Sequence, residues 1–185
     1  MEDLEQFRLE TRAWLEANCP PSQRLPTTPE EQYWGGRRGT FASADAKLWF
    51  ERMRDRGWTA PEWPTQYGGG GLSPQQGRVL KEEMKRINAR SPILGIGLWM
   101  LGPAVLEYGN EQQKQQHLRA IVNGEIRWAQ GYSEPGSGSD LASLQCKAQD
   151  MGDHFLVNGS KIWTTAADKC DWIFCLVRTD PNVKQ

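Results

Sequence analysis

The stretch EIRWAQGYSEPGSGSDLASLQCKA, residues 125–148, marks a change in the pattern of the sequence. Before it, apolar residues recur at helical spacing. From Leu144 onward, apolar and polar residues alternate, which is the period of a half-buried strand. Helices followed by strands indicate either an α+β fold or two separate domains. We place the boundary near Gly124 to Trp128.

The helical part carries start and stop signals for helices. Apolar stripes predict helices that begin near Leu4, Ser43, Ser73, Ser91 and Glu111. Ser73-Pro74-Gln75-Gln76 combines an N-cap, a first-turn proline and a capping-box glutamine. Glu2 and Asp3 lie at the positive end of the first helix dipole. Ser91-Pro92 is expected to begin an apolar helix, which Gly102-Pro103 interrupts.

The strand part predicts about four short strands. Asn158-Gly159 stands between two strand-like runs and indicates a hairpin there. Residues 171–179, DWIFCLVRT, predict a strand buried on nearly both faces. A sheet of this size exposes edges and one face. We therefore interpret Gln185 as the end of a truncated piece.

Composition narrows the class of protein. The 185 residues have a formal net charge of -1, which indicates no nucleic-acid partner. The four cysteines form no CxxC pair and the two histidines stand far apart, so we expect no metal site. No apolar run is long enough for a membrane span, and the acidic N-terminus is unlike a signal peptide. These features favour a cytoplasmic protein with reduced thiols.

The segment GYSEPGSGSD, residues 131–140, can be a spacer or a site. It matches none of three known patterns: the dinucleotide-binding glycine motif, the P-loop and the serine-hydrolase motif. Its glycines allow close approach of the backbone to a ligand, and its serines offer hydroxyls. Its amides could form an anion nest. The alternative is a turn that satisfies itself, with Asp140 bonding to loop amides.

A second segment, KIWTTAAD, covers residues 161–168. Strand alternation would place Trp163 and Thr165 on one face. An indole beside a hydroxyl suits a flat heteroaromatic ligand with polar edges, such as a flavin. Tryptophan and threonine are also simply good strand formers.

Together these segments resemble the N-terminal part of an acyl-CoA dehydrogenase. The resemblance rests on GWTAPEWPTQYGGGGLS, on the passage from LGPAVLEYGNEQQK to the E-P-x-x-G-S-D signature, and on GDHFLVNGSKIWTTAADKCDWIFCLVRTDP. It implies an N-terminal helical bundle over residues 1–126. It also implies the first strands of an antiparallel β-barrel domain over residues 127–185, and a C-terminal four-helix domain absent from this chain.

The resemblance implies FAD as cofactor and an acyl-CoA thioester as substrate. By position, the cofactor-binding residues are Gln130, Tyr132, Ser133, Gly138, Ser139, Trp163, Thr164 and Thr165. Trp163 would cover one face of the flavin ring, while Ser133 and Thr165 would lie near its N5 and O4 edge. Gly138 and Ser139 would line the pyrophosphate, with Ser139 also at the approach of the substrate. Glu134 is assigned to loop structure rather than to catalysis.

The resemblance also implies the rest of the reaction. The family's catalytic base is a carboxylate of the C-terminal domain, so no residue here is assigned that role. In fatty acid beta-oxidation the electrons pass to electron-transferring flavoprotein, and members assemble as homo-oligomers, dimers or tetramers. We expect the chain by itself to be inactive and to bind FAD poorly.

Other readings share this scaffold. Acyl-CoA oxidases and flavin monooxygenases have a similar architecture. A DNA-associated relative would be expected to carry a basic surface, which the net charge disfavours. A non-catalytic scaffold that assembles with a partner is the remaining alternative.

Overall fold

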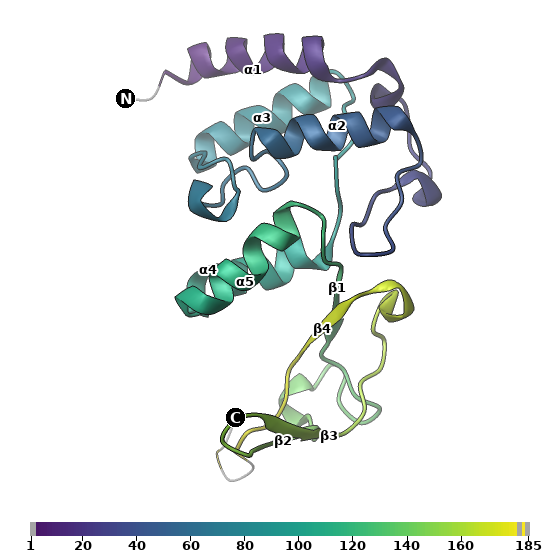
Figure 1. Cartoon of the computed structure of the whole chain (residues 1–185), viewed down its shortest axis with the longest axis vertical. Helices are drawn as coiled ribbons and strands as arrows, with labels where there is room; N and C mark the ends of the chain where they lie inside the picture. The colour runs from purple at the N-terminus through teal and green to yellow at the C-terminus, as the bar shows by residue number, and fades with distance from the viewer. Residues whose placement is uncertain (1–2, 181–182, 184–185) are drawn as a thin grey trace. The chain divides into compact units, whose positions relative to one another are not determined.

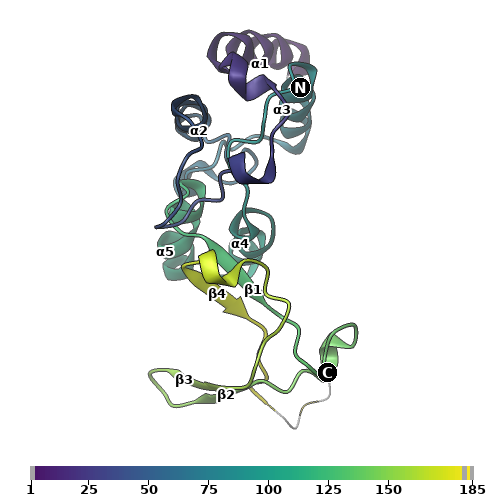
Figure 2. The same cartoon turned by 90° about the vertical axis from the view of Figure 1, so that its right-hand side faces the viewer.

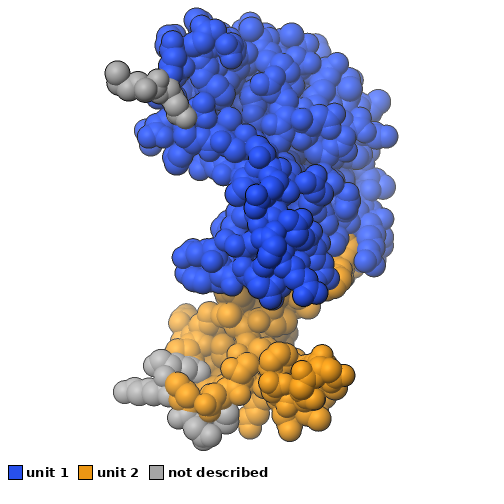
Figure 3. Space-filling view, turned by 60° about the vertical axis from the view of Figure 1, so that its left-hand side comes forward, with its two compact units in different colours: residues 1–127 blue, residues 128–185 orange. Residues whose placement is uncertain are grey.

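The computed structural model describes residues 3–180 and residue 183. The chain divides into a helical unit, residues 1–127, and a strand unit, residues 128–185 (Figure 3). This order of helices followed by strands confirms the predicted fold class. Glu2 and Gln185, on which two of the expectations rest, lie outside the described residues.

The helical unit contains five α-helices among the described residues (Figure 1). They are α1 (Leu4–Asn18), α2 (Ala44–Asp55), α3 (Pro74–Arg86), α4 (Gly102–Tyr108) and α5 (Glu111–Val122). Short 3-10 turns occur at Pro21–Arg24, Pro29–Glu31 and Thr65–Tyr67. A core of Leu15, Cys19, Trp49, Met53, Trp58 and Leu80 joins α1, α2 and α3.

The helix caps follow the sequence signals. Ser73 and Gln76 form the predicted capping box at the start of α3. The Ser43 side chain accepts a hydrogen bond from Ala46 N at the start of α2, and Asp3 does the same for Gln6 N in α1. Gly57, just after α2, adopts the left-handed conformation typical of a helix stop.

The helix predicted from Ser91 begins later than expected. Residues 91–95 are not helical, because their backbone pairs with an earlier loop: Leu94 N donates to Tyr33 O. A π-helical turn, Gly97–Leu101, leads directly into α4, so Gly102-Pro103 does not interrupt the helix. Pro103 lies in the first turn, where its missing N–H is tolerated. A side chain at Gly102 would overlap the Trp63 ring.

The views in Figures 1 and 2 agree that α4 and α5 lie side by side, and the two helices are in contact. The predicted inward residues of α5, Leu118, Ile121 and Val122, are buried. The stop at Gly124 is also confirmed, since this residue has a φ of +66°.

The strand unit has four strands among its described residues, in two pairs. The strands are β1 (Trp128–Gly131), β2 (Lys147–Asp150), β3 (Phe155–Asn158) and β4 (Trp172–Cys175). β2 and β3 pair antiparallel, as expected for this region. β1 and β4 pair in parallel, with Trp128 opposite Trp172, a pairing the sequence did not predict.

Two expectations for the strand unit are wrong. The hairpin connects β2 to β3 through residues 151–154, and Asn158-Gly159 instead ends β3. A Cβ on Gly159 would lie 2.7 Å from Cys146 Sγ, so the glycine marks a close crossing of two segments. β4 is four residues long, and Trp172 and Ile173 are exposed rather than buried on both faces.

Candidate functional site

The loop from Gly131 to Asp140 leaves the end of β1 and reaches a short 3-10 turn, Leu141–Ser143, before β2. The loop therefore follows strand β1 directly. Ser137 N donates to Glu134 O at 3.0 Å, and Glu134 N donates to Ser137 O at 2.9 Å. This pair of bonds closes a tight turn around Pro135 and Gly136, residue types that favour turns.

Glu134 anchors the loop from the inside. Its side chain is 7% exposed, and its carboxylate accepts hydrogen bonds from Gln145 N at 2.6 Å and Cys146 N at 2.8 Å. Lys161 Nζ completes the set at 2.8 Å from Glu134 Oε1. Burial alone would raise the pKa of Glu134, but these three donors outweigh it and lower the pKa to about 2. The carboxylate stays ionised and engaged, which is consistent with a structural role.

The side chain that binds backbone amides of this region belongs to Glu134 and not to Asp140. The alternative reading of the loop had Asp140 bonding to loop amides. In the structure Asp140 contributes its backbone oxygen, which accepts from Ser143 N at 3.2 Å and Ser143 Oγ at 2.8 Å. The side chain of Glu134 binds the amides instead.

Lys161 joins the two predicted site segments. Its ammonium group donates to Tyr132 O at 3.0 Å as well as to Glu134. One residue later, Ile162 N donates to Ser133 O at 2.9 Å. The backbone at Tyr132 and Ser133 thus lies directly beside the segment that leads into Trp163. Sequence reasoning missed Lys161; its only signal was a lysine just before the Trp-Thr-Thr run.

The segment after Lys161 is not a strand. Trp163 and Ala166 both have positive φ, at 58° and 52°, which a regular strand does not allow. The prediction that strand alternation places Trp163 and Thr165 on one face is therefore wrong. Left-handed backbone is costly for residues other than glycine and concentrates at functional sites. Trp163 is also 85% exposed.

The remaining predicted residues occupy different surroundings. Gln130 pairs with Phe174 across β1 and β4, and the Tyr132 ring meets the edge of Phe174 at 5.6 Å. Gly138 and Ser139 are exposed, and a Cβ on Gly136 or Gly138 would meet no atom within 4 Å. Neither glycine has positive φ. The fold of the chain itself therefore does not require glycine at these positions.

The described residues also bear on two other features, a metal site and a membrane span. They contain no group of three or more His, Cys, Asp or Glu side chains that could hold a metal ion. No described helix is long and apolar enough to cross a membrane.

Both units match domains of known proteins. The acyl-CoA dehydrogenase N-terminal domain matches residues 1–125, and the acyl-CoA dehydrogenase middle domain matches residues 129–185. Acyl-CoA dehydrogenase IpdE1 of Mycobacterium tuberculosis is 36% identical over 180 residues, which cover 97% of this chain and 46% of that protein. Acyl-CoA dehydrogenase FadE34 of the same organism is 42% identical over 130 residues, or 70% of this chain and 18% of that protein.

Solved structures give the same result. The Tcur3481-Tcur3483 steroid ACAD matches with a TM-score of 0.67 and 36% identity, covering 97% of this chain and 44% of that chain. The ChsE4-ChsE5 complex from Mycobacterium tuberculosis matches with a TM-score of 0.66 and 29% identity, covering 98% and 44%. The chain spans less than half the length of these relatives. Because two domains of one family together match almost every residue, the chain belongs to the acyl-CoA dehydrogenase family.

Proposed function

We propose that this chain supplies the flavin-holding part of an FAD-dependent acyl-CoA dehydrogenase, which converts an acyl-CoA thioester to the trans-2-enoyl-CoA. One observation carries the proposal: Lys161 Nζ and Ile162 N bond to Tyr132 O and Ser133 O. These bonds bring the two segments that the family resemblance assigns to the flavin into direct contact. The names of the relatives, which are dehydrogenases, favour this reaction over an oxidase or a monooxygenase.

The chemistry of the contact region suits a flavin nucleotide. Trp163 presents a flat, exposed surface for ring stacking. The hydroxyls of Ser133 and Thr165 make no hydrogen bond to the part of the chain that the structure describes, so both are available to ring-edge atoms. The open backbone around Gly138 leaves room for a pyrophosphate.

Each predicted residue has a role in this proposal. Trp163 covers one face of the isoalloxazine, and Ser133 and Thr165 hold its N5 and O4 edge. Donors at that edge stabilise charge that develops as the ring is reduced. Gly138 and Ser139 line the pyrophosphate, and Ser139 also borders the substrate. The further contacts come from Gln130, Tyr132 and Thr164, partly through backbone groups.

FAD, when bound, would supply the acceptor for the hydride from the substrate β-carbon, and a carboxylate base outside this chain would take the α-proton. The residues of this chain orient the ring and its edge for that transfer. Electron-transferring flavoprotein is the proposed final acceptor. Reduction of that protein, as opposed to consumption of oxygen, distinguishes the dehydrogenase from an oxidase.

Titration of the chain with FAD tests the proposal. We expect weak binding with quenching of the flavin fluorescence, and about a tenfold weaker association for Trp163→Ala because one stacking face is lost. Trp99→Ala is the matched control, since Trp99 is also exposed, at 53%, but lies in the helical unit. If the two variants weaken FAD binding equally, or neither does, Trp163 is not the stacking residue.

The assembly is a separate part of the proposal. We expect a cytoplasmic oligomer, either of identical copies or with a related second chain. Two solved relatives favour the second possibility, because each carries the names of two proteins: Tcur3481-Tcur3483 and ChsE4-ChsE5. The mass of the protein in solution, with and without co-expressed relatives, separates the two.

A further inference from the structure

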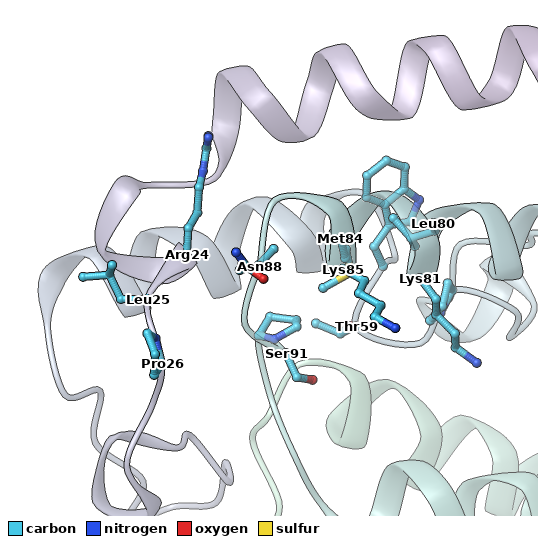
Figure 4. Close-up of a pocket in the computed structure, with 14 residues that line it drawn as sticks. Arg24, Leu25, Pro26, Thr59, Leu80, Lys81, Met84, Lys85, Asn88 and Ser91 are labelled. Carbon is cyan, nitrogen blue, oxygen red and sulfur yellow. The ribbon is translucent and has the colours of Figure 1, made fainter.

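Lys161 carries a buried ammonium group in the strand unit. Lysines usually keep their charge in water, as the exposed Lys81 and Lys85 do along the hollow beside α3 (Figure 4). The Lys161 side chain is 9% exposed, although burial of an ammonium group is costly. Its two acceptors are Glu134 Oε1 at 2.8 Å and the carbonyl oxygen of Tyr132 at 3.0 Å. The bond to the carboxylate compensates the charge, whereas the bond to the carbonyl acts on the backbone.

The backbone on both sides of Ser133 is fixed by the segment that contains Lys161. The carbonyl before Ser133 belongs to Tyr132 and receives the ammonium group. The carbonyl of Ser133 itself accepts a hydrogen bond from Ile162 N at 2.9 Å. Two bonds from neighbouring residues thus hold Ser133 on either side, so the chain itself sets the direction of the Ser133 N–H.

This N–H has no acceptor within the described chain. Neither Ser133 N nor Ser133 Oγ bonds to any residue that the structure describes, and Ser133 is half-buried. The next N–H along the chain, at Glu134, already donates to Ser137 O. Backbone N–H groups are strong donors that are seldom left without an acceptor. The Ser133 N–H is therefore available to an acceptor from outside the chain.

The ammonium group and the open N–H lie at opposite ends of one peptide group. Tyr132 O and Ser133 N belong to the same peptide, which is trans. In a planar trans peptide the C=O and the N–H point in opposite directions. A cation at the oxygen draws electron density from the nitrogen, and linked hydrogen bonds strengthen one another in this way. Lys161 therefore makes the Ser133 N–H a stronger donor from the side opposite to its acceptor.

We propose that Lys161 is a positioning residue for the flavin: through the peptide between Tyr132 and Ser133, it orients and strengthens the Ser133 N–H, which donates to an acceptor atom at the edge of the ring. The inference rests on the proposed function, because it takes the flavin as the ligand. Reduction places negative charge at the ring edge, so a stronger donor there favours reduced over oxidised FAD. Lys161 thus sets the preference of the site for the reduced ring, in addition to holding the loop.

The test measures the dissociation constants of oxidised FAD and of dithionite-reduced FAD for the whole chain, by equilibrium dialysis without oxygen. The ratio of the two constants gives the preference of the site. We expect the parent chain to bind reduced FAD more tightly. Lys161→Met should lower this preference about fivefold, the size of a typical hydrogen-bond contribution. Lys147→Met removes the same charge from an exposed position in β2 and should leave the ratio unchanged.

Two further variants separate positioning from folding. Lys161→Met alone leaves the Glu134 carboxylate buried without its cation, which destabilises the loop. Glu134→Gln combined with Lys161→Met removes both charges, so the loop should stay folded, as hydrogen exchange of the Gln145 and Cys146 amides would show. This double variant should lose the preference for reduced FAD to the same extent. Lys161→Arg keeps a charged donor for both acceptors and should retain the preference.

The outcomes distinguish this inference from the proposed function. If the parent chain binds neither form of FAD, the proposed function fails and the inference fails with it. If the parent binds both forms but the double variant keeps the parent's ratio, the proposed function stands and Lys161 only holds the loop together. A parent chain that binds the two forms equally would also overturn the inference. An equal loss of preference in Lys147→Met would assign the effect to net charge and not to the peptide.

Discussion

Each unit buries a glutamate that accepts hydrogen bonds from at least one positively charged side chain. The two glutamates differ in the number of these partners and in the elements that they connect. Glu83, 2% exposed, receives the guanidinium groups of Arg8, Arg12 and Arg86. It ties α1 to α3, and hydrogen bonds led by Arg12 outweigh burial and lower its pKa to about 2. Glu134 has one ammonium group and two backbone amides. It ties together two loops, not two helices.

Gly102 of the helical unit and the two glycines of the loop from Gly131 to Asp140 that are open, Gly136 and Gly138, have different surroundings. In the helical unit, the Trp63 ring occupies the space where a Gly102 side chain would lie. In the loop of the strand unit, a Cβ added to Gly136 or Gly138 would meet no atom within 4 Å, and neither glycine has a positive φ. Packing within the chain accounts for the glycine at position 102. It does not account for Gly136 and Gly138, and the proposed function assigns Gly138 to the cofactor pyrophosphate.

Among the changes considered, replacement of Lys161 should lower the stability of its unit most. Lys161→Met leaves the Glu134 carboxylate buried without its cation, which costs about 3–5 kcal/mol. Arg12→Met is the control, because Glu83 keeps Arg8 and Arg86 and should lose less. Hydrogen exchange of the Gln145 and Cys146 amides measures the first loss. Equal losses in the two units would show that Glu134 depends no more on a single cation than Glu83 does.

Acid should weaken both units in the same range of pH. The pKa of Glu134 is about 2 in the folded chain and about 4.3 when unfolded, so its stabilisation is complete above the unfolded value. It is lost as the pH falls from about 4 to about 2, a change of roughly 2–3 kcal/mol. Hydrogen exchange against pH measures this. Glu134→Gln should flatten the profile of the strand unit only, and Glu83→Gln that of the helical unit only.

The sequence predicted the local signals well, because caps and stops depend on neighbouring residues. The capping box at Ser73 and the stops at Gly57 and Gly124 are examples. It failed where distant segments decide the outcome. Residues 91–95 are not helical, since Leu94 N donates to Tyr33 O, and the parallel pairing of β1 with β4 joins residues far apart in the chain.

In the candidate site, too, the sequence predicted local features and missed those that depend on distant segments. The residue types at Trp163 and Thr165 indicated a flat ligand, but the strand geometry assumed for them was wrong. The contact between the two segments depends on Lys161, whose partners lie 27 and 29 residues earlier. A lysine near a tryptophan carries no sign of such partners in the sequence alone.

Gly102→Ala tests the packing side of the comparison. The added methyl group must displace the Trp63 ring, and overpacking of this kind costs typically about 1–3 kcal/mol. Urea unfolding followed by helical circular dichroism measures the loss. A neutral outcome would mean that the contact between Gly102 and Trp63 relaxes freely, and that the glycines of the two units do not differ as described.

Gly138→Ala has the smallest expected effect on stability and tests the functional side. No chain atom lies near the added methyl group, and φ at this position is not positive. The unfolded chain loses freedom, so the variant should be as stable as the parent or more stable by about 0.4–1 kcal/mol. If the loop approaches a pyrophosphate, the same methyl group should weaken FAD binding, measured by flavin fluorescence. A loss of stability with unchanged FAD binding would reverse the interpretation, because the glycine would then serve the loop and not the cofactor.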